Sequence, residues 1–249
     1  MQEINRWASD STDGLIDNIV NEFSPNTITV LANALYFADR WLWELDSNDA
    51  KEGIFYSPSG ERPAYFMLRE GNNQSYYEDD TIQAIRLEFK TGGGLCVLLP
   101  KTGDAKGLLS SITPEKFNSI MAGTEQKTGK LLLPRFTINS GTLRLADELK
   151  LLGIQLIGER QYTLLDGFIE GDTPVWISEV MQEAFIEVDE NGTTAAAVTV
   201  IAAAGARPNR ATDPFEMICD KPFVFILYGD LDSSLGSLVV LFIGTLNLP

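Results

Sequence analysis

Apolar and polar positions follow two different patterns along the first part of the chain. In residues 3–20 the apolar side chains recur at helical spacing, with Gly14 interrupting them, which predicts an amphipathic helix. Residues 27–37 (TITVLANALYF) are nearly uncharged and rich in β-branched side chains, which is typical of a central strand buried on both faces. The chain is therefore expected to combine surface helices with a buried sheet.

The later pattern is mostly that of sheet. Residues 54–69 and 83–99 are predicted antiparallel strands, because the turn sequences SPSG and TGGG bound their apolar runs. Residues 131–138 read as a strand and 143–154 as a helix, and 221–230 with 237–246 form an apolar hairpin. With no internal repeat or proline-rich linker, the pattern predicts one α+β domain over residues 1–249 with mixed and antiparallel sheets.

Composition removes several classes of function. A net charge of −16, from 35 acidic and 19 basic residues, argues against nucleic acid, heparin and anionic membrane surfaces as partners. The chain has no histidine, which excludes a Ser-His-Asp triad, a Cys-His pair and histidine metal ligands. Most hydrolases are thereby excluded, while chemistry that uses carboxylates alone stays open. Cys96 and Cys219 lie in apolar runs typical of buried free thiols.

One segment does not fit an ordinary domain surface. Residues 191–206 (NGTTAAAVTVIAAAGA) are sixteen consecutive uncharged residues after the predicted strand EAFIEVDE. They are too few to span a bilayer, and a buried alanine-rich helix is the competing interpretation. The β-branched residues and the flanking Gly192 and Gly205 favour an extended conformation instead. As a strand the run has no charge on either face, so it could enter an existing sheet without desolvating an ion.

The hinge sequence ENGTTAAAVT resembles the start of the reactive loop of serpins, the serine protease inhibitor family. Four more segments resemble the family in the expected order: the start of the predicted first helix, TVLANALYFADRW, DKPFVFIL and LVVLFIGTLNLP. The resemblance implies the serpin fold and a suicide-substrate inhibitor, which is not an enzyme and needs no metal or other cofactor. A serine protease attacks the loop, at about residues 190–211, forms a covalent acyl-enzyme, and the cleaved loop inserts as a new central strand.

The resemblance also assigns the site residues. The hinge comprises Gly192, Thr193, Thr194, Ala195, Ala196, Ala197, Val198 and Thr199, and the breach and shutter positions comprise Trp41, Asn33 and Gln182. Counting from the hinge puts the reactive bond between Ala206 and Arg207, which implies an elastase-like target. A tryptic alternative lies between Arg210 and Ala211, because Pro208 makes the bond after Arg207 a poor substrate.

Against the family pattern, the segments expected before the first helix are missing, so the chain is expected to be the C-terminal two-thirds of a serpin. The lost sheet strands would expose an edge, which predicts self-association through loop-sheet insertion. A non-inhibitory binding serpin and an inactive truncated fragment are the alternatives. No signal peptide is seen in this chain, an extracellular or cell-surface setting is expected for the full-length parent, and Gln182 at the position of a common histidine suits a prokaryotic source.

Overall fold

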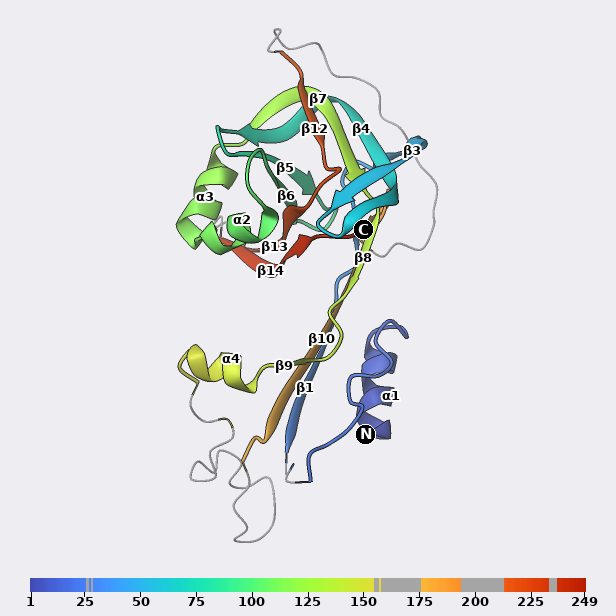
Figure 1. Ribbon diagram of the computed structural model, residues 1–249, viewed down its shortest axis with the longest axis vertical. Coiled ribbons are helices and arrows are strands. Elements are labelled where there is room, and N and C mark those ends of the chain that lie inside the picture. The colour runs from blue at the N-terminus through green and yellow to red at the C-terminus, as the bar shows by residue number, and fades with distance from the viewer. Residues whose placement is uncertain (26, 28, 155–156, 158–175, 194–212, 233–236) are drawn as a thin grey trace. The chain divides into compact units, whose positions relative to one another are not determined.

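The computed structural model describes residues 1–25, 27, 29–154, 157, 176–193, 213–232 and 237–249 (Figure 1). The chain forms two compact units. The first comprises Met1–Phe37 and Thr137–Ile186, and the second comprises Ala38–Phe136 and Glu187–Pro249.

The first unit is built on two long neighbouring strands. β1 (Val30–Tyr36) and β10 (Glu179–Val188) pair in parallel over seven residues, from Val30 with Glu179 to Tyr36 with Phe185. Its other elements are α1 (Gln2–Ser11), β8 (Phe136–Asn139), β9 (Leu143–Arg144) and α4 (Ala146–Leu151). Both β8 and β9 pair with β10, and β9 does so antiparallel.

The first helix is shorter than the predicted 3–20. It ends at Ser11 because the Thr12 hydroxyl donates to the Ala8 carbonyl at 2.7 Å and accepts from the Ile16 amide at 3.0 Å. Asp13 and Gly14 then adopt positive φ values of 52° and 81°, which no continuing helix can contain. Of the predicted apolar face, Ile16 and Ile19 after the turn are fully buried, but Trp7 is 46% exposed. The prediction was therefore wrong about the length of the helix and about Trp7.

The strand within 27–37 is confirmed as β1, but its predicted burial on both faces is wrong. Ala32 and Ala34 pack towards α1 in a core cluster that includes Ala8. On the other face Leu31 is 54% exposed and Asn33 is exposed, within the part of the chain described. The predicted helix 143–154 is also shorter, because its first residues form β9 and only α4 is helical.

The second unit is a strongly bent sheet with two helices. Its eight-stranded sheet runs in the order β12-β7-β4-β5-β6-β13-β14, with β3 beside β4. The elements are β2 (Asp39–Arg40), β3 (Asp46–Ser57), β4 (Gly60–Glu78), β5 (Ile82–Glu88), β6 (Gly94–Pro100), α2 (Ala105–Ser111), α3 (Pro114–Ala122), β7 (Glu125–Pro134), β11 (Gly192–Thr193), β12 (Phe215–Ile218), β13 (Phe223–Asp232) and β14 (Ser237–Leu246). The predicted antiparallel strands and the final hairpin are thereby confirmed.

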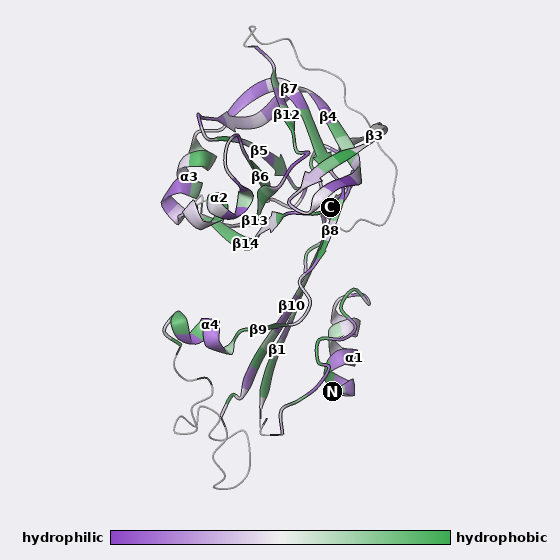
Figure 2. Ribbon diagram, viewed as in Figure 1, coloured by the Kyte–Doolittle hydropathy of each residue, from purple (hydrophilic) through white to green (hydrophobic). Residues whose placement is uncertain are grey.

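The core of this unit forms where α2 and α3 cover one face of the sheet. Buried side chains from β5, β6 and β13 pack against the two helices, and Phe117 meets Tyr228 edge-on at 6.2 Å. Each helix has a side-chain cap, because Asp104 accepts from the Gly107 amide and Thr113 accepts from the Lys116 amide. The apolar colouring of β14 in Figure 2 reflects the apolar run that predicted this hairpin.

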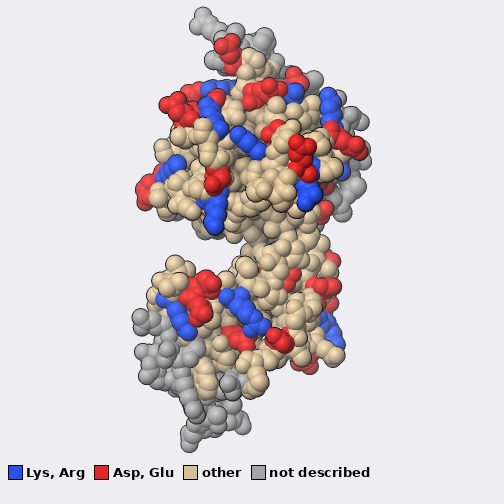
Figure 3. Space-filling model, in the orientation of Figure 1, with Lys and Arg blue, Asp and Glu red and all other residues tan. Residues whose placement is uncertain are grey.

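Both cysteines are free and fully buried, as predicted. Burial raises the pKa of the Cys96 thiol to about 12, and it also raises that of Cys219. On the face of the second unit drawn in Figure 3, acidic and basic side chains are interspersed. No helix among the described residues is long and apolar enough to cross a membrane.

Candidate functional site

The candidate site is the turn between β10 and β11, where the uncharged segment begins. After Val188 the chain reverses direction, and Thr193 pairs antiparallel with Val188. The Asp189 carboxylate accepts from the Asn191 amide at 2.7 Å and from the Gly192 amide at 3.0 Å, while the Asp189 amide donates to the Gly192 carbonyl at 2.9 Å. These bonds fix the turn from both ends.

The short strand β11 is paired on both sides. Besides its partner in β10, it pairs antiparallel with β2, with Gly192 opposite Arg40 and Thr193 opposite Asp39. Thr193 is fully buried, and its hydroxyl accepts from the Asp39 amide at 3.1 Å and donates to the Asp39 carbonyl at 3.4 Å. The first two residues of the predicted hinge are therefore already part of a sheet.

Glycine is required at position 192 by the close approach of β2. A Cβ atom at this position would lie 2.0 Å from the Asp39 carbonyl oxygen and 2.7 Å from the Arg40 Cα. Both contacts are with backbone, which cannot rotate away as a side chain could. The hinge glycine thus permits β11 and β2 to pair.

Trp41 donates two hydrogen bonds to the turn. Its indole N–H donates to the Asp189 carbonyl at 2.8 Å, and its backbone amide donates to the Asn191 carbonyl at 2.9 Å. The ring is 1% exposed and stacks on Phe89, with centroids 4.8 Å apart and planes 10° from parallel. The structure therefore places the predicted breach tryptophan in direct contact with the hinge turn.

An ion pair between the buried Glu190 and the half-exposed Arg135 holds the same turn, and the sequence did not predict it. Glu190 is 5% exposed, and its carboxylate accepts from the Arg135 guanidinium, with Nε at 2.9 and 2.8 Å from the two carboxylate oxygens. The Glu190 hydrogen bond and charge raise the pKa of Arg135, which also lies over the Tyr65 ring at 4.3 Å. The sequence signals were a lone arginine after LLLP and the last acidic residue before the uncharged run.

The predicted shutter residues meet in the first unit. Asn33 and Gln182 are register partners in β1 and β10, and the Asn33 amide donates to the Gln182 side-chain oxygen at 3.5 Å. The hydrogen bond that the two amides were expected to make is present, and both groups keep their charge state at any pH at which the protein is folded.

The remaining predicted site residues lie outside the described residues. These are Thr194 to Thr199 of the hinge and both candidate reactive bonds, Ala206–Arg207 and Arg210–Ala211. Of the site residues that are described, Trp41, Gly192 and Thr193 come together at the turn.

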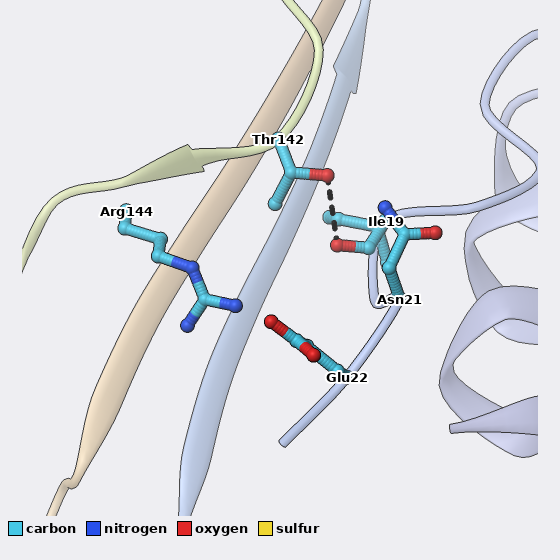
Figure 4. A pocket seen from close by; sticks show the side chains of 5 residues that line it. All are labelled: Ile19, Asn21, Glu22, Thr142 and Arg144. Carbon is cyan, nitrogen blue, oxygen red and sulfur yellow. Dashed lines mark hydrogen bonds between the residues drawn. The ribbon is translucent and has the colours of Figure 1, made fainter. Parts of the chain in front are cut away.

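A pocket lies beside β9 in the first unit. It has a volume of about 270 Å³ and is lined by Ile19, Asn21, Glu22, Thr142 and Arg144. In Figure 4 the Glu22 and Arg144 side chains point into it, and Thr142 donates to the Ile19 carbonyl at 3.0 Å. Arg144 is already paired with Glu179, so its charge is satisfied. No cluster of three or more potential metal ligands occurs among the described residues.

The fold agrees with comparisons with known proteins. The family model described as Serpin (serine protease inhibitor) matches residues 1–249, and the chain belongs to the serpin family. The family is one of protease inhibitors rather than enzymes.

Relatives occur in distant organisms. An uncharacterized serpin-like protein of Thermococcus kodakarensis is 30% identical, over 100% of this chain and 56% of the relative. Serpin-Z1B of Triticum aestivum is 32% identical, over 99% of this chain and 63% of the relative. The native-state crystal structure of the thermophilic serpin Tengpin matches with a TM-score of 0.83 at 25% identity, over 100% of this chain and 62% of that one. The chain thus spans about three fifths of the length of these relatives.

Proposed function

We propose that the chain acts as an irreversible serine protease inhibitor, in which a protease cleaves the loop after β11 and the loop then inserts between β1 and β10. The observation that carries this proposal is the double pairing of β11. The loop leaves β10 as a strand that already lies between the end of β10 and β2, and β2 follows β1 along the chain. Insertion would extend an existing strand and would need no new nucleus.

The strand directions also suit insertion. β1 and β10 run parallel to each other, and β11 runs antiparallel to β10. A strand continuing in the direction of β11 would therefore run antiparallel to both β1 and β10. One parallel ladder would be replaced by two antiparallel ladders, and antiparallel pairing is slightly more stable per residue.

The energy of this exchange favours insertion. The seven pairs of the β1–β10 ladder would be lost, and about the same number would form on each side of the new strand. Each backbone hydrogen bond contributes roughly 0.5–1.5 kcal/mol net. The gain is therefore one additional ladder of about seven pairs. The sum is several kcal/mol at least.

We further propose an elastase-like target, because Gly205 and Ala206 are small residues before the reactive bond to Arg207. Cleavage between Arg210 and Ala211 by a trypsin-like protease is the alternative.

The relatives come from an archaeon and a plant, so the proposed prokaryotic source stays a prediction. We also keep the proposal that the chain corresponds to the C-terminal two-thirds of a serpin and self-associates through loop-sheet insertion.

The test is to incubate the chain with pancreatic elastase and separately with trypsin, then to analyse the products by denaturing gel and mass spectrometry. The proposal predicts a covalent band at the summed mass and release of the peptide that begins at Arg207 with elastase, or at Ala211 with trypsin. A binding protein or a reversible inhibitor would give no such band.

A hinge variant separates trapping from simple cleavage. Thr193→Arg puts a charge at a fully buried position, so insertion should fail and the loop should be cleaved without a complex. The matched control is Asn191→Arg, because Asn191 is exposed two residues away. Equal amounts of complex from the Thr193→Arg and Asn191→Arg variants would contradict insertion through the hinge.

A further inference from the structure

A small donor-rich pocket in the second unit is formed by Trp43 and by residues of β4, β5 and β7. Its volume is about 190 Å³, and it is lined by Trp43, Arg69, Asn73, Ser75, Arg86, Glu88 and Gln126. This is smaller than the pockets that hold drug-sized ligands, which are roughly 300–1,000 Å³. Two arginines face a single glutamate, so the lining carries an excess positive charge in a chain whose net charge is −16.

The two arginines differ in how they are held. The Arg86 guanidinium donates from Nε to the Tyr228 hydroxyl at 3.2 Å and lies 3.7 Å from the Glu88 carboxylate. Arg69 has no hydrogen-bond acceptor and no ion pair for its guanidinium among the described residues, and Glu88 acts on it through charge alone. Burial lowers the pKa of Arg69. Desolvation of a cation without a paired acceptor is unfavourable, and an anion in the pocket would offset it.

The neutral groups in the lining are also positioned to donate. The Ser75 hydroxyl accepts from the Gln126 amide at 2.8 Å, so its own O–H proton remains available for another acceptor. Ser75 is 8% exposed and belongs to the lining of the pocket. Arg69 and Ser75 therefore offer a charged donor and a neutral donor to one ligand.

A bulge in β4 shapes the mouth of the pocket. The register between β4 and β7 shifts between Gly71 and Gln74, and Asn73 adopts a positive φ of 60°. The Gln74 side-chain amide fixes the bulge by donating to the Gly71 carbonyl at 3.2 Å and to the Gly129 carbonyl at 2.7 Å. Bulges commonly redirect side chains beside binding sites. This bulge lies between Arg69 and Ser75 in the sequence, and Asn73, which is part of it, also lines the pocket.

We infer that this pocket binds a small oxyanion, such as phosphate, sulfate or a carboxylate, through the guanidinium of Arg69 and the hydroxyl of Ser75. Guanidinium groups match the oxygen geometry of these anions and form charge-assisted hydrogen bonds with them. The inference does not depend on protease inhibition, because every residue of the pocket lies between Trp43 and Gln126 and none belongs to the loop.

The test measures the melting temperature of the chain at increasing sodium phosphate, with sodium chloride keeping the ionic strength constant. A ligand that binds only the folded state raises the melting temperature in a saturable way. Arg69→Gln should shift the phosphate midpoint at least tenfold upwards, because it removes charge-assisted hydrogen bonds. The matched control is Arg62→Gln, an exposed arginine of the same strand, which should titrate like the unmodified protein.

Two further measurements keep the test decisive if Arg69→Gln does not fold. Ser75→Ala retains both arginines and should raise the phosphate midpoint by about threefold or more, which corresponds to one neutral hydrogen bond. Trp43 lines the pocket, so phosphate should change the tryptophan fluorescence, and Trp43→Phe should abolish that change. Acetate in place of phosphate tests whether the pocket prefers a planar carboxylate or a tetrahedral anion. The preferred anion should reach the midpoint of the rise in melting temperature at the lower concentration.

The inference is overturned if phosphate, sulfate and acetate give no saturable rise in the melting temperature. It is equally overturned if the rise is the same in the Arg69→Gln and Arg62→Gln variants, because the rise would then be the general stabilisation that excluded salts confer on any folded protein.

Discussion

Removal of Arg135 should release the hinge turn, because it leaves the carboxylate of Glu190 buried without its partner. Taken as one charge-assisted interaction, the Arg135–Glu190 pair contributes about 1.5–3 kcal/mol. The Arg135 side chain is 47% exposed, so water can replace part of this interaction and the lower end of the range applies. The contact with the Tyr65 ring adds about 0.5 kcal/mol. The expected cost of Arg135→Ala is about 2 kcal/mol, or roughly a 30-fold change in local opening.

Hydrogen exchange measures this opening directly. The Gly192 amide is bonded within the turn, and β11 is held in the sheet by the pairing of Thr193. The protection of the Gly192 and Thr193 amides against exchange should fall roughly 30-fold in Arg135→Ala. Arg62→Ala, which changes an exposed arginine, should leave this protection unchanged.

A double-mutant cycle separates the ion pair from other effects of truncation. In a Glu190→Gln background there is no carboxylate for Arg135 to pair with, so Arg135→Ala should cost about 1 kcal/mol less than in the unmodified chain. Protection that changes less than about threefold in Arg135→Ala, or costs that are equal in the two backgrounds, would refute the view that this ion pair holds the turn.

Three further perturbations have direct readouts. Gly192→Ala would bring a Cβ to 2.0 Å from the Asp39 carbonyl oxygen, so β11 should detach from β2 and protease cleavage of the turn should become faster in limited digestion. Cys96 should resist alkylation until the protein unfolds, because the thiol is fully buried and its pKa is about 12; rapid labelling of the folded chain would contradict this. Burial opposes ionisation of Asp79, but hydrogen bonds from the Thr81 hydroxyl and amide outweigh it and lower the Asp79 pKa to about 2. The carboxylate therefore stabilises the fold above about pH 4 and loses its contribution as the pH falls towards 2. In a plot of melting temperature against pH, Asp79→Asn should reduce the fall between about pH 4 and pH 2.

The strands were the most predictable part of the fold, because their side-chain period is local. The turn sequences SPSG and TGGG located the antiparallel strands β3 to β6. The extent of the first helix was not predictable from spacing, since Ile16 and Ile19 are buried whether or not the helix continues past Thr12. Likewise, the sequence of an apolar strand does not reveal which neighbours cover its two faces, so the exposure of Leu31 on β1 could not be predicted.

The residues of the site that were predicted came from the resemblance of short segments to serpins. ENGTTAAAVT identified Gly192 and Thr193, and TVLANALYFADRW identified Trp41, although Trp41 is far from the hinge in sequence. The partnership of Arg135 with Glu190 joins residues 55 positions apart, and it depends on a turn that no local pattern specifies. The oxyanion pocket was missed for the same reason, because Arg69 and Ser75 become neighbours of Trp43 only when the sheet bends.

Locking β1 to β10 tests the central claim most directly. Asn33 and Gln182 are register partners on neighbouring strands, and paired strands lie about 4.7–4.9 Å apart. An Asn33→Cys, Gln182→Cys variant therefore places the two Cα atoms within the roughly 4.4–6.8 Å range of a disulfide. If the cleaved loop must enter between these strands, elastase should form a covalent complex with the reduced variant and should only cleave the oxidised one. Equal amounts of covalent complex in the two redox states, or none in either, would contradict insertion between β1 and β10.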